Sequence, residues 1–152
     1  MAGNTAEIQD LNEMIKLVIF RVNDEEYGVD VSLIKSIERM MQITRVPNVQ
    51  EYILGVMNLR GSVIPVVDLR SRFGFSATEI KEETRIIVLS IDDVDVGIVV
   101  DSCSDVTDIN RDQIEPPPSV VGAIEATFIQ GVTKIDRRLI ILLDMEKTLK
   151  IK

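Results

Sequence analysis

The feature that most constrains the fold of this 152-residue chain is an internal repeat. Leu17–Val31 aligns without a gap on Ile86–Val100, and Gly55–Leu69 aligns in the same way on Gly131–Met145. The offset between the copies is 69 residues in the first segment and 76 in the second, so the second copy carries seven extra residues. A repeat on this scale predicts two structural units of the same design.

Each copy is a run of short apolar segments separated by polar turns. These segments are rich in β-branched residues, which favours strands: Leu17–Val22, Tyr27–Val31, Val56–Leu59 and Val63–Val67 in the first copy, and Ile86–Ile91, Val96–Val100, Gly131–Ile135 and Leu139–Leu143 in the second. About five short strands per copy are typical of a small barrel, because closure removes the exposed edges of a short sheet.

Each copy then ends in a predicted short helix. Asp68 precedes Leu69–Phe73, and Asp144 precedes Met145–Leu149, in the position where an aspartate caps a helix. Gly74 is placed to end the first of these helices.

Two similar five-stranded barrels, related by a pseudo-twofold axis, are therefore expected over residues 16–75 and 85–152. Units of this size are marginal alone, so they are expected to share an interface. A terminal strand or helix that crosses from one barrel to complete the other is compatible with the same pattern. Residues 1–15 are expected to form a flexible arm or a short helix.

The composition excludes several classes of protein. The net charge of −8 disfavours binding to nucleic acid. The chain has no histidine and one cysteine, Cys103, which removes Ser-His-Asp and Cys-His catalysis and zinc sites built on either residue. No metal or other cofactor is expected. The sequence shows neither an apolar run of membrane-spanning length nor a signal peptide, so we expect a cytoplasmic protein.

Two classes of function stay open at this point. A carboxylate enzyme would use Asp68, Asp101 and Asp144, although Asp68 and Asp144 are better explained as helix caps because they recur in the repeat. A small-ligand binder would use a pocket between the two barrels.

Four segments resemble the CheW family of chemotaxis coupling proteins: FRVNDEEYGVDV, GVMNLRGSVIPVVDLR, VGIVVDSCSDV and RLIILLDMEKTL. The resemblance extends from Lys16 to Leu149. It implies a mainly β fold of two small SH3-like barrels with short helices, and no enzymatic activity. The implied function is that of an adaptor, which couples the regulatory domain of a CheA-type histidine kinase to the cytoplasmic tips of chemoreceptors. Recruitment to receptor arrays at the inner face of the cell membrane is expected with it.

The turn at Asn58-Leu59-Arg60-Gly61 is the most specific part of the resemblance. The second copy has Asp136 and Arg137 where the first has Arg60 and Gly61. This difference indicates that the first turn has a function besides folding. The alternative is a solvated turn arginine. Gly61 is expected to adopt a positive φ, and Arg60 can offer its planar guanidinium to a partner.

The resemblance also assigns the contact residues. It places receptor contacts at Ile34, Ser36, Glu38, Asn58, Arg60 and Cys103, and kinase contacts at Ile43, Thr44 and Gly55.

Overall fold

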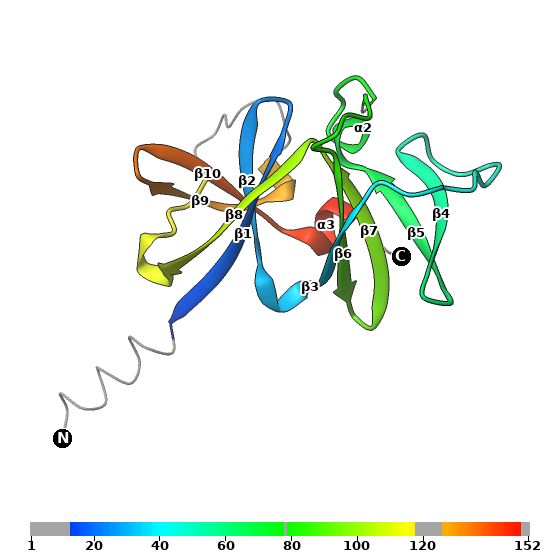
Figure 1. Ribbon diagram of the computed structural model, residues 1–152. Helices are drawn as coiled ribbons and strands as arrows, with labels where there is room; N and C mark the ends of the chain where they lie inside the picture. Colours follow the sequence, from blue (N-terminus) through cyan, green and yellow to red (C-terminus); the bar gives the residue numbers. More distant parts are fainter. Residues whose placement is uncertain (1–12, 78, 118–125, 150–152) are drawn as a thin grey trace.

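Ten strands dominate the structure, a computed structural model that describes residues 13–77, 79–117 and 126–149 (Figure 1). Sheet A has the strand order β8-β1-β2-β10-β9, formed by Ser102–Asn110, Met14–Val22, Glu25–Asp30, Arg138–Leu143 and Ile129–Ile135. Sheet B has the order β3-β6-β7-β5-β4, formed by Ile34–Arg39, Arg85–Ile91, Val94–Val100, Ser62–Asp68 and Ile53–Leu59. The prediction of a mainly β fold with two five-stranded units is confirmed.

The boundaries of the two sheets differ from those of the two repeats. Sheet B is continuous in sequence over residues 34–100, whereas sheet A combines β1 and β2 with β8, β9 and β10. The expected barrels at 16–75 and 85–152 are therefore not the sheets: the first hairpin of each repeat pairs with the three later strands of the other. The repeat shows that the copies are equivalent, but it does not specify which copy each hairpin joins.

The two edges of each sheet are joined by one isolated bridge and not by a continuous ladder. In sheet B, the backbone groups of Thr44 and Val56 exchange two hydrogen bonds of 2.8 Å just beyond β3. In sheet A, Glu115 and Val132 do the same, at 2.8 and 2.9 Å, beyond β8. The two units thus share one design, as the repeat predicts.

The apolar residues form three cores. Sheet B encloses a cluster that includes Met57, Ile64 and Val88, and sheet A encloses one that includes Leu17 and Ile140. The largest cluster lies between the sheets: Phe20, Val22, Tyr27, Val29, Val67, Leu69, Phe73, Ile87, Leu89, Ile91, Val96, Ile98, Val100, Phe128, Ile129, Val132, Ile141, Leu143, Met145 and Leu149. Since β1 and β6 contribute side chains from both faces to the apolar cores, Leu17–Phe20 in β1 and Ile86–Leu89 in β6 are apolar without interruption.

All six aromatic residues of the chain gather at this shared core. Phe73 is central, with ring centroids 5.4 Å from Tyr27, 5.9 Å from Phe128 and 6.3 Å from Phe75. The Arg72 guanidinium lies between the rings of Tyr52 and Phe128, at 4.7 and 4.6 Å from their centroids. Tyr52 and Phe128 are 76 residues apart and are therefore equivalent in the repeat, so Arg72 lies close to the pseudo-twofold axis.

Two short helices follow β5 and β10, the last strand of each repeat copy. Helix α2, Leu69–Arg72, is preceded by Asp68, whose carboxylate accepts a hydrogen bond from the Arg70 N–H. Helix α3, Met145–Leu149, is preceded by Asp144, whose carboxylate accepts one from the Lys147 N–H at 3.2 Å. No helix in the described residues is long and apolar enough to cross a membrane.

The N-terminal expectation lies mostly outside the described residues. Residues 1–12 are not described, and β1 already begins at Met14, inside the segment expected to be an arm or a helix. Residues 118–125, within the insertion of the second copy, also lie outside the described part of the chain.

Candidate docking surfaces

The turn that contains Arg60 is a two-residue hairpin between β4 and β5. Both central residues have positive φ, 51° at Arg60 and 89° at Gly61, and the Asn58 side chain accepts the Gly61 N–H at 3.0 Å. The Arg60 side chain is 72 % exposed and reaches Glu38 on β3, where both terminal nitrogens lie 3.4 Å from Oε2. Three of the expected receptor-contacting residues, Glu38, Asn58 and Arg60, are thus brought together at this tip.

Of the remaining expected receptor contacts, Ile34 and Cys103 lie where the two sheets meet, whereas Ser36 is the cross-strand partner of Val88 in the sheet B core. Along β3, Ile34, Ser36 and Glu38 are half-buried and alternate with exposed neighbours. Ile34 from sheet B and Cys103 from sheet A both pack against the shared core. Burial raises the pKa of the Cys103 thiol above its ordinary value, with Arg85 acting in the opposite direction and Asp105 adding to the rise. Cys103 is therefore an apolar contact in this position and not an activated nucleophile.

The expected kinase contacts lie at the bridge that closes sheet B. Ile43 is half-buried against the sheet B core, while Thr44 is exposed. Gly55 is buried, with φ of 146°, and a Cβ atom there would lie 2.0 Å from the Thr44 carbonyl oxygen. The geometry gives Gly55 a structural role, because only glycine lets β4 pass so close to the backbone at Thr44.

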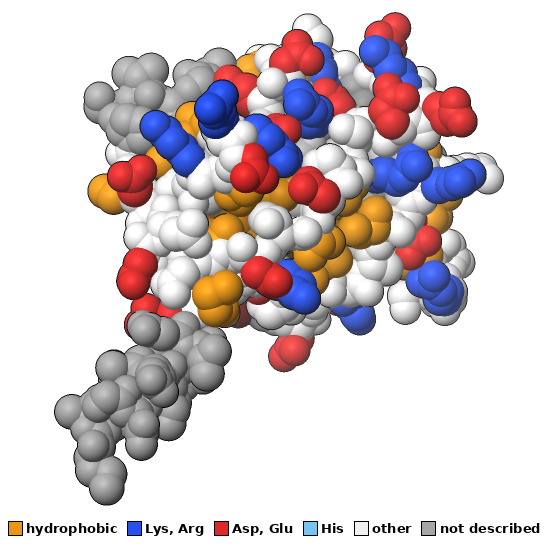
Figure 2. Space-filling model, turned by 60° about the vertical axis from the view of Figure 1, so that its left-hand side comes forward, with side chains coloured by type: hydrophobic (Ala, Val, Ile, Leu, Met, Phe, Trp, Pro, Cys, Tyr) orange, Lys and Arg blue, Asp and Glu red, His pale blue; other side chains and the backbone are white. Residues whose placement is uncertain are grey.

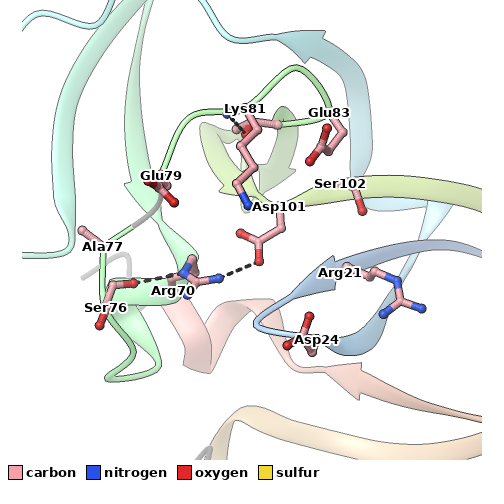
Figure 3. A pocket seen from close by; sticks show the side chains of 11 residues that line it. Arg21, Asp24, Arg70, Ser76, Ala77, Glu79, Lys81, Glu83, Asp101 and Ser102 are labelled. Atoms are coloured by element: carbon pink, nitrogen blue, oxygen red, sulfur yellow. Dashed lines mark hydrogen bonds and ion pairs between the residues drawn. The ribbon is translucent and has the colours of Figure 1, made fainter.

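A cleft of about 510 Å³ lies at the junction of the two sheets (Figure 3). At its centre, Arg70 forms a 2.7 Å ion pair with Asp101, the single residue between β7 and β8. Arg70 also donates to the Asn23 side chain at 3.2 Å and to the Ser76 carbonyl at 3.0 Å, and Asp101 accepts the Asn23 N–H at 2.8 Å. This network ties the β1–β2 turn of sheet A to helix α2.

The ion pair between Arg70 and Asp101, with the hydrogen bonds of both residues to Asn23, forms a clasp that links the two barrels. Acidic and basic side chains line it together: Asp24, Glu79, Glu83 and Asp101 with Arg21, Arg70 and Lys81. Ligand pockets are mostly apolar with a few free polar groups, whereas the central groups here bind one another. Asp101 is thus engaged in the clasp, and Asp68 and Asp144 precede helices, so the three carboxylates considered for catalysis have separate local roles.

Comparison with known proteins decides the family. A family model described as a CheW-like domain matches residues 16–152. The chain belongs to the CheW family. It is 41 % identical over 145 residues to the chemotaxis protein CheW of Bacillus subtilis, covering 95 % of this chain and 91 % of that protein. It is 33 % identical to the chemotaxis protein CheW of Thermotoga maritima, covering 94 % of this chain and 93 % of that one.

A solved CheW structure has the same fold. The crystal structure of the scaffolding protein TtCheW from Thermoanaerobacter tengcongensis superposes with a TM-score of 0.83, at 34 % identity, over 91 % of this chain and 89 % of that one. The chain is accordingly a chemotaxis scaffold or adaptor protein, and not an enzyme.

Several residues at the junction were not identified from the sequence. Arg70, Asn23 and Arg72 looked like ordinary turn and helix residues, and only the pairing of distant segments gives them partners. Two exposed apolar residues, Val63 and Leu139, were also not singled out. They are 67 % and 48 % exposed, and alignment of the two copies would have paired them, because they occupy equivalent positions in the repeat.

Proposed function

We propose that this CheW-family protein couples a CheA-type histidine kinase to chemoreceptors, without chemistry of its own. One surface would dock on the regulatory domain of the kinase, and a second on the cytoplasmic tip of a receptor. Holding both partners makes later contacts intramolecular, so that modest individual affinities suffice for a stable array. The protein would be recruited in this way to receptor arrays at the inner face of the cell membrane.

The observation that carries the proposal is the arrangement around Arg60. Its guanidinium is mostly exposed on a two-residue turn, and its ion pair with Glu38 is long at 3.4 Å. An exposed ion pair of this kind adds about 0–1 kcal/mol to stability, so an incoming carboxylate or carbonyl can compete for the guanidinium at small cost. Ile34, half-buried on the same strand as Glu38, would supply the apolar part of the receptor contact.

The kinase contact would lie at the other end of sheet B. Ile43 and Thr44 flank the bridge to Val56, where the backbone is fixed by two hydrogen bonds. A surface on a fixed backbone loses little conformational freedom on binding. Gly55 would contribute by shaping this backbone, since its own surface is buried.

The test is reconstitution of kinase control in receptor-containing membranes from the same organism. Arg60→Ala is expected to weaken receptor-dependent control of the kinase while leaving the thermal unfolding midpoint within a few degrees of the parent. Arg137→Ala, at the equivalent exposed turn of the second copy, is the matched control and is expected to behave like the parent. Normal receptor control with Arg60→Ala would remove Arg60 from the receptor surface.

A further inference from the structure

Strands β3 and β6 place two arginines directly opposite each other. Arg39, the last residue of β3, is the cross-strand partner of Arg85, the first residue of β6. Like charges in this position repel and destabilise a sheet. The other two strand arginines, Arg21 and Arg138, each form an ion pair with Glu26, at 3.1 and 2.8 Å. In the described part of the chain, no carboxylate lies within ion-pair distance of Arg39 or Arg85.

This pairing is unexpected for so acidic a chain. With 25 acidic and 17 basic residues, carboxylates are in excess, and two unneutralised guanidinium groups side by side need a reason. Asp105, the acidic group that acts on Cys103 together with Arg85, is itself engaged by Arg138 at 3.5 Å and by the Ser104 hydroxyl at 2.8 Å.

The arginine pair faces the junction between the two sheets. On β6, Ile87 and Leu89 point into the shared core, and residues two apart in a strand lie on the same face, so Arg85 lies on that face too. Ile37, the cross-strand partner of Ile87, is 42 % exposed beside the pair. Burial raises the pKa of Cys103 on β8 of the other sheet, and the charge of Arg85 opposes this rise, so that charge acts across the junction.

Arg85 is held in place ahead of any partner. Its Nη1 donates to the backbone carbonyls of Glu82 and Thr84, at 2.8 and 2.9 Å, and its side chain is half-buried. Arg39 is exposed. One guanidinium is therefore fixed and the other can adjust, which suits a carboxylate that accepts hydrogen bonds from both.

We infer that Arg39 and Arg85 together bind a carboxylate of the receptor tip, from an aspartate or glutamate that lies beside apolar residues. The inference rests on the proposed receptor coupling and adds the chemistry that the receptor must present. The apolar neighbour Ile37 would receive those apolar residues, and the bound carboxylate would neutralise the repulsion between the two arginines. Figure 2 shows hydrophobic side chains exposed in a band across one face of the molecule, with charged side chains on both sides of the band.

The test measures binding of a fluorescently labelled receptor-tip fragment from the same organism by anisotropy. Arg39→Gln and Arg85→Gln are each expected to weaken binding about tenfold, as loss of a charge-assisted hydrogen bond predicts. Arg39→Lys, which keeps the charge, is expected to lose less. Because the repulsion is removed, the urea midpoint of Arg39→Gln is expected to stay unchanged or to rise.

Two controls separate this inference from general damage and from the proposed function. Arg111→Gln removes the same charge from an exposed position beyond the far end of β8 and is expected to bind the tip like the parent. Binding of the kinase regulatory domain is expected to be equal in all variants. If the parent binds the tip and both glutamine variants match it, the assignment of the carboxylate to the Arg39–Arg85 pair is wrong while receptor coupling stands. If the parent binds the kinase domain but not the tip, receptor coupling and the inference fail together.

Discussion

At the residue scale, comparison of the equivalent turns in the two copies shows which features of these turns folding requires. The sequence suggests that Gly61 is needed for a positive φ, yet Arg137 adopts φ of 69° at the equivalent position without a glycine. The four two-residue turns, at 23–24, 60–61, 92–93 and 136–137, all have positive φ at both central residues. The distinguishing feature of the first-copy turn is therefore the Arg60 side chain and its reach to Glu38, not its backbone.

A buried threonine gives a prediction about stability. Thr133 on β9 is fully buried, and its hydroxyl has no hydrogen-bond partner in the described structure. Thr133→Val removes this unsatisfied hydroxyl with little change in shape, so the free energy of unfolding is expected to rise by about 1 kcal/mol. Urea denaturation of parent and variant measures the difference.

Thr148 supplies the matched control for that substitution. It is equally buried, but its hydroxyl donates to the Asp144 carbonyl at 2.7 Å. Thr148→Val is therefore expected to lower the free energy of unfolding, by about 1 kcal/mol. A loss of stability in Thr133→Val as large as that in Thr148→Val would show that the Thr133 hydroxyl is satisfied in solution.

At the scale of the elements, the closure of each barrel depends on a glycine. A Cβ at Gly55 would overlap the Thr44 carbonyl, and one at Gly131 would lie 2.8 Å from the Glu115 carbonyl oxygen, so the copies use the same device. Gly55→Ala is expected to lower the free energy of unfolding by about 3 kcal/mol, because backbone must move at a closed bridge. Chemical denaturation measures this loss.

Gly61→Ala is the control for the glycine test. Gly61 also has a positive φ, but a Cβ there meets no atom within 4 Å. Only the conformational preference is lost, so a cost of about 1 kcal/mol is expected. Equal costs at Gly55 and Gly61 would contradict the close approach at the bridge.

The element positions could largely be predicted from the sequence, whereas their pairing could not. Eight strands and both helices were predicted within about three residues, because apolar segments alternate with strong turn signals. The strands at Ile34–Arg39 and Ser102–Asn110 were not assigned individually, since exposed and half-buried residues dominate them. The exchange of hairpins, the Arg70–Asp101 clasp and the opposed arginines depend on which distant segments pair, and local pattern does not contain that information.

At the scale of the whole molecule, the shared core predicts that the two barrels fold as one unit. Sheet B is continuous, but its strands β6 and β7 contribute Ile87, Leu89, Val96, Ile98 and Val100 to the core shared with sheet A. Residues 31–101 expressed alone would expose this apolar face. We therefore expect that fragment to lack a cooperative thermal transition and to bind a hydrophobic dye, whereas the full chain unfolds in a single transition.

The reverse result would change the account of the fold. A residue 31–101 fragment that unfolds cooperatively as a monomer, with dispersed amide resonances, would show that sheet B folds independently. The shared core, the clasp at Arg70 and the position of Arg72 would then serve to orient two autonomous domains.

The central claim, that this CheW-family chain is an adaptor for a histidine kinase, is tested most directly by one titration. The full-length protein is titrated calorimetrically with the regulatory domain of a CheA-type kinase from the same organism, both partners being shown folded by circular dichroism. Saturable binding near one-to-one, in the micromolar range or tighter, is the predicted result. Absence of binding between the two folded proteins would contradict the account, because the fold would then serve a different partner.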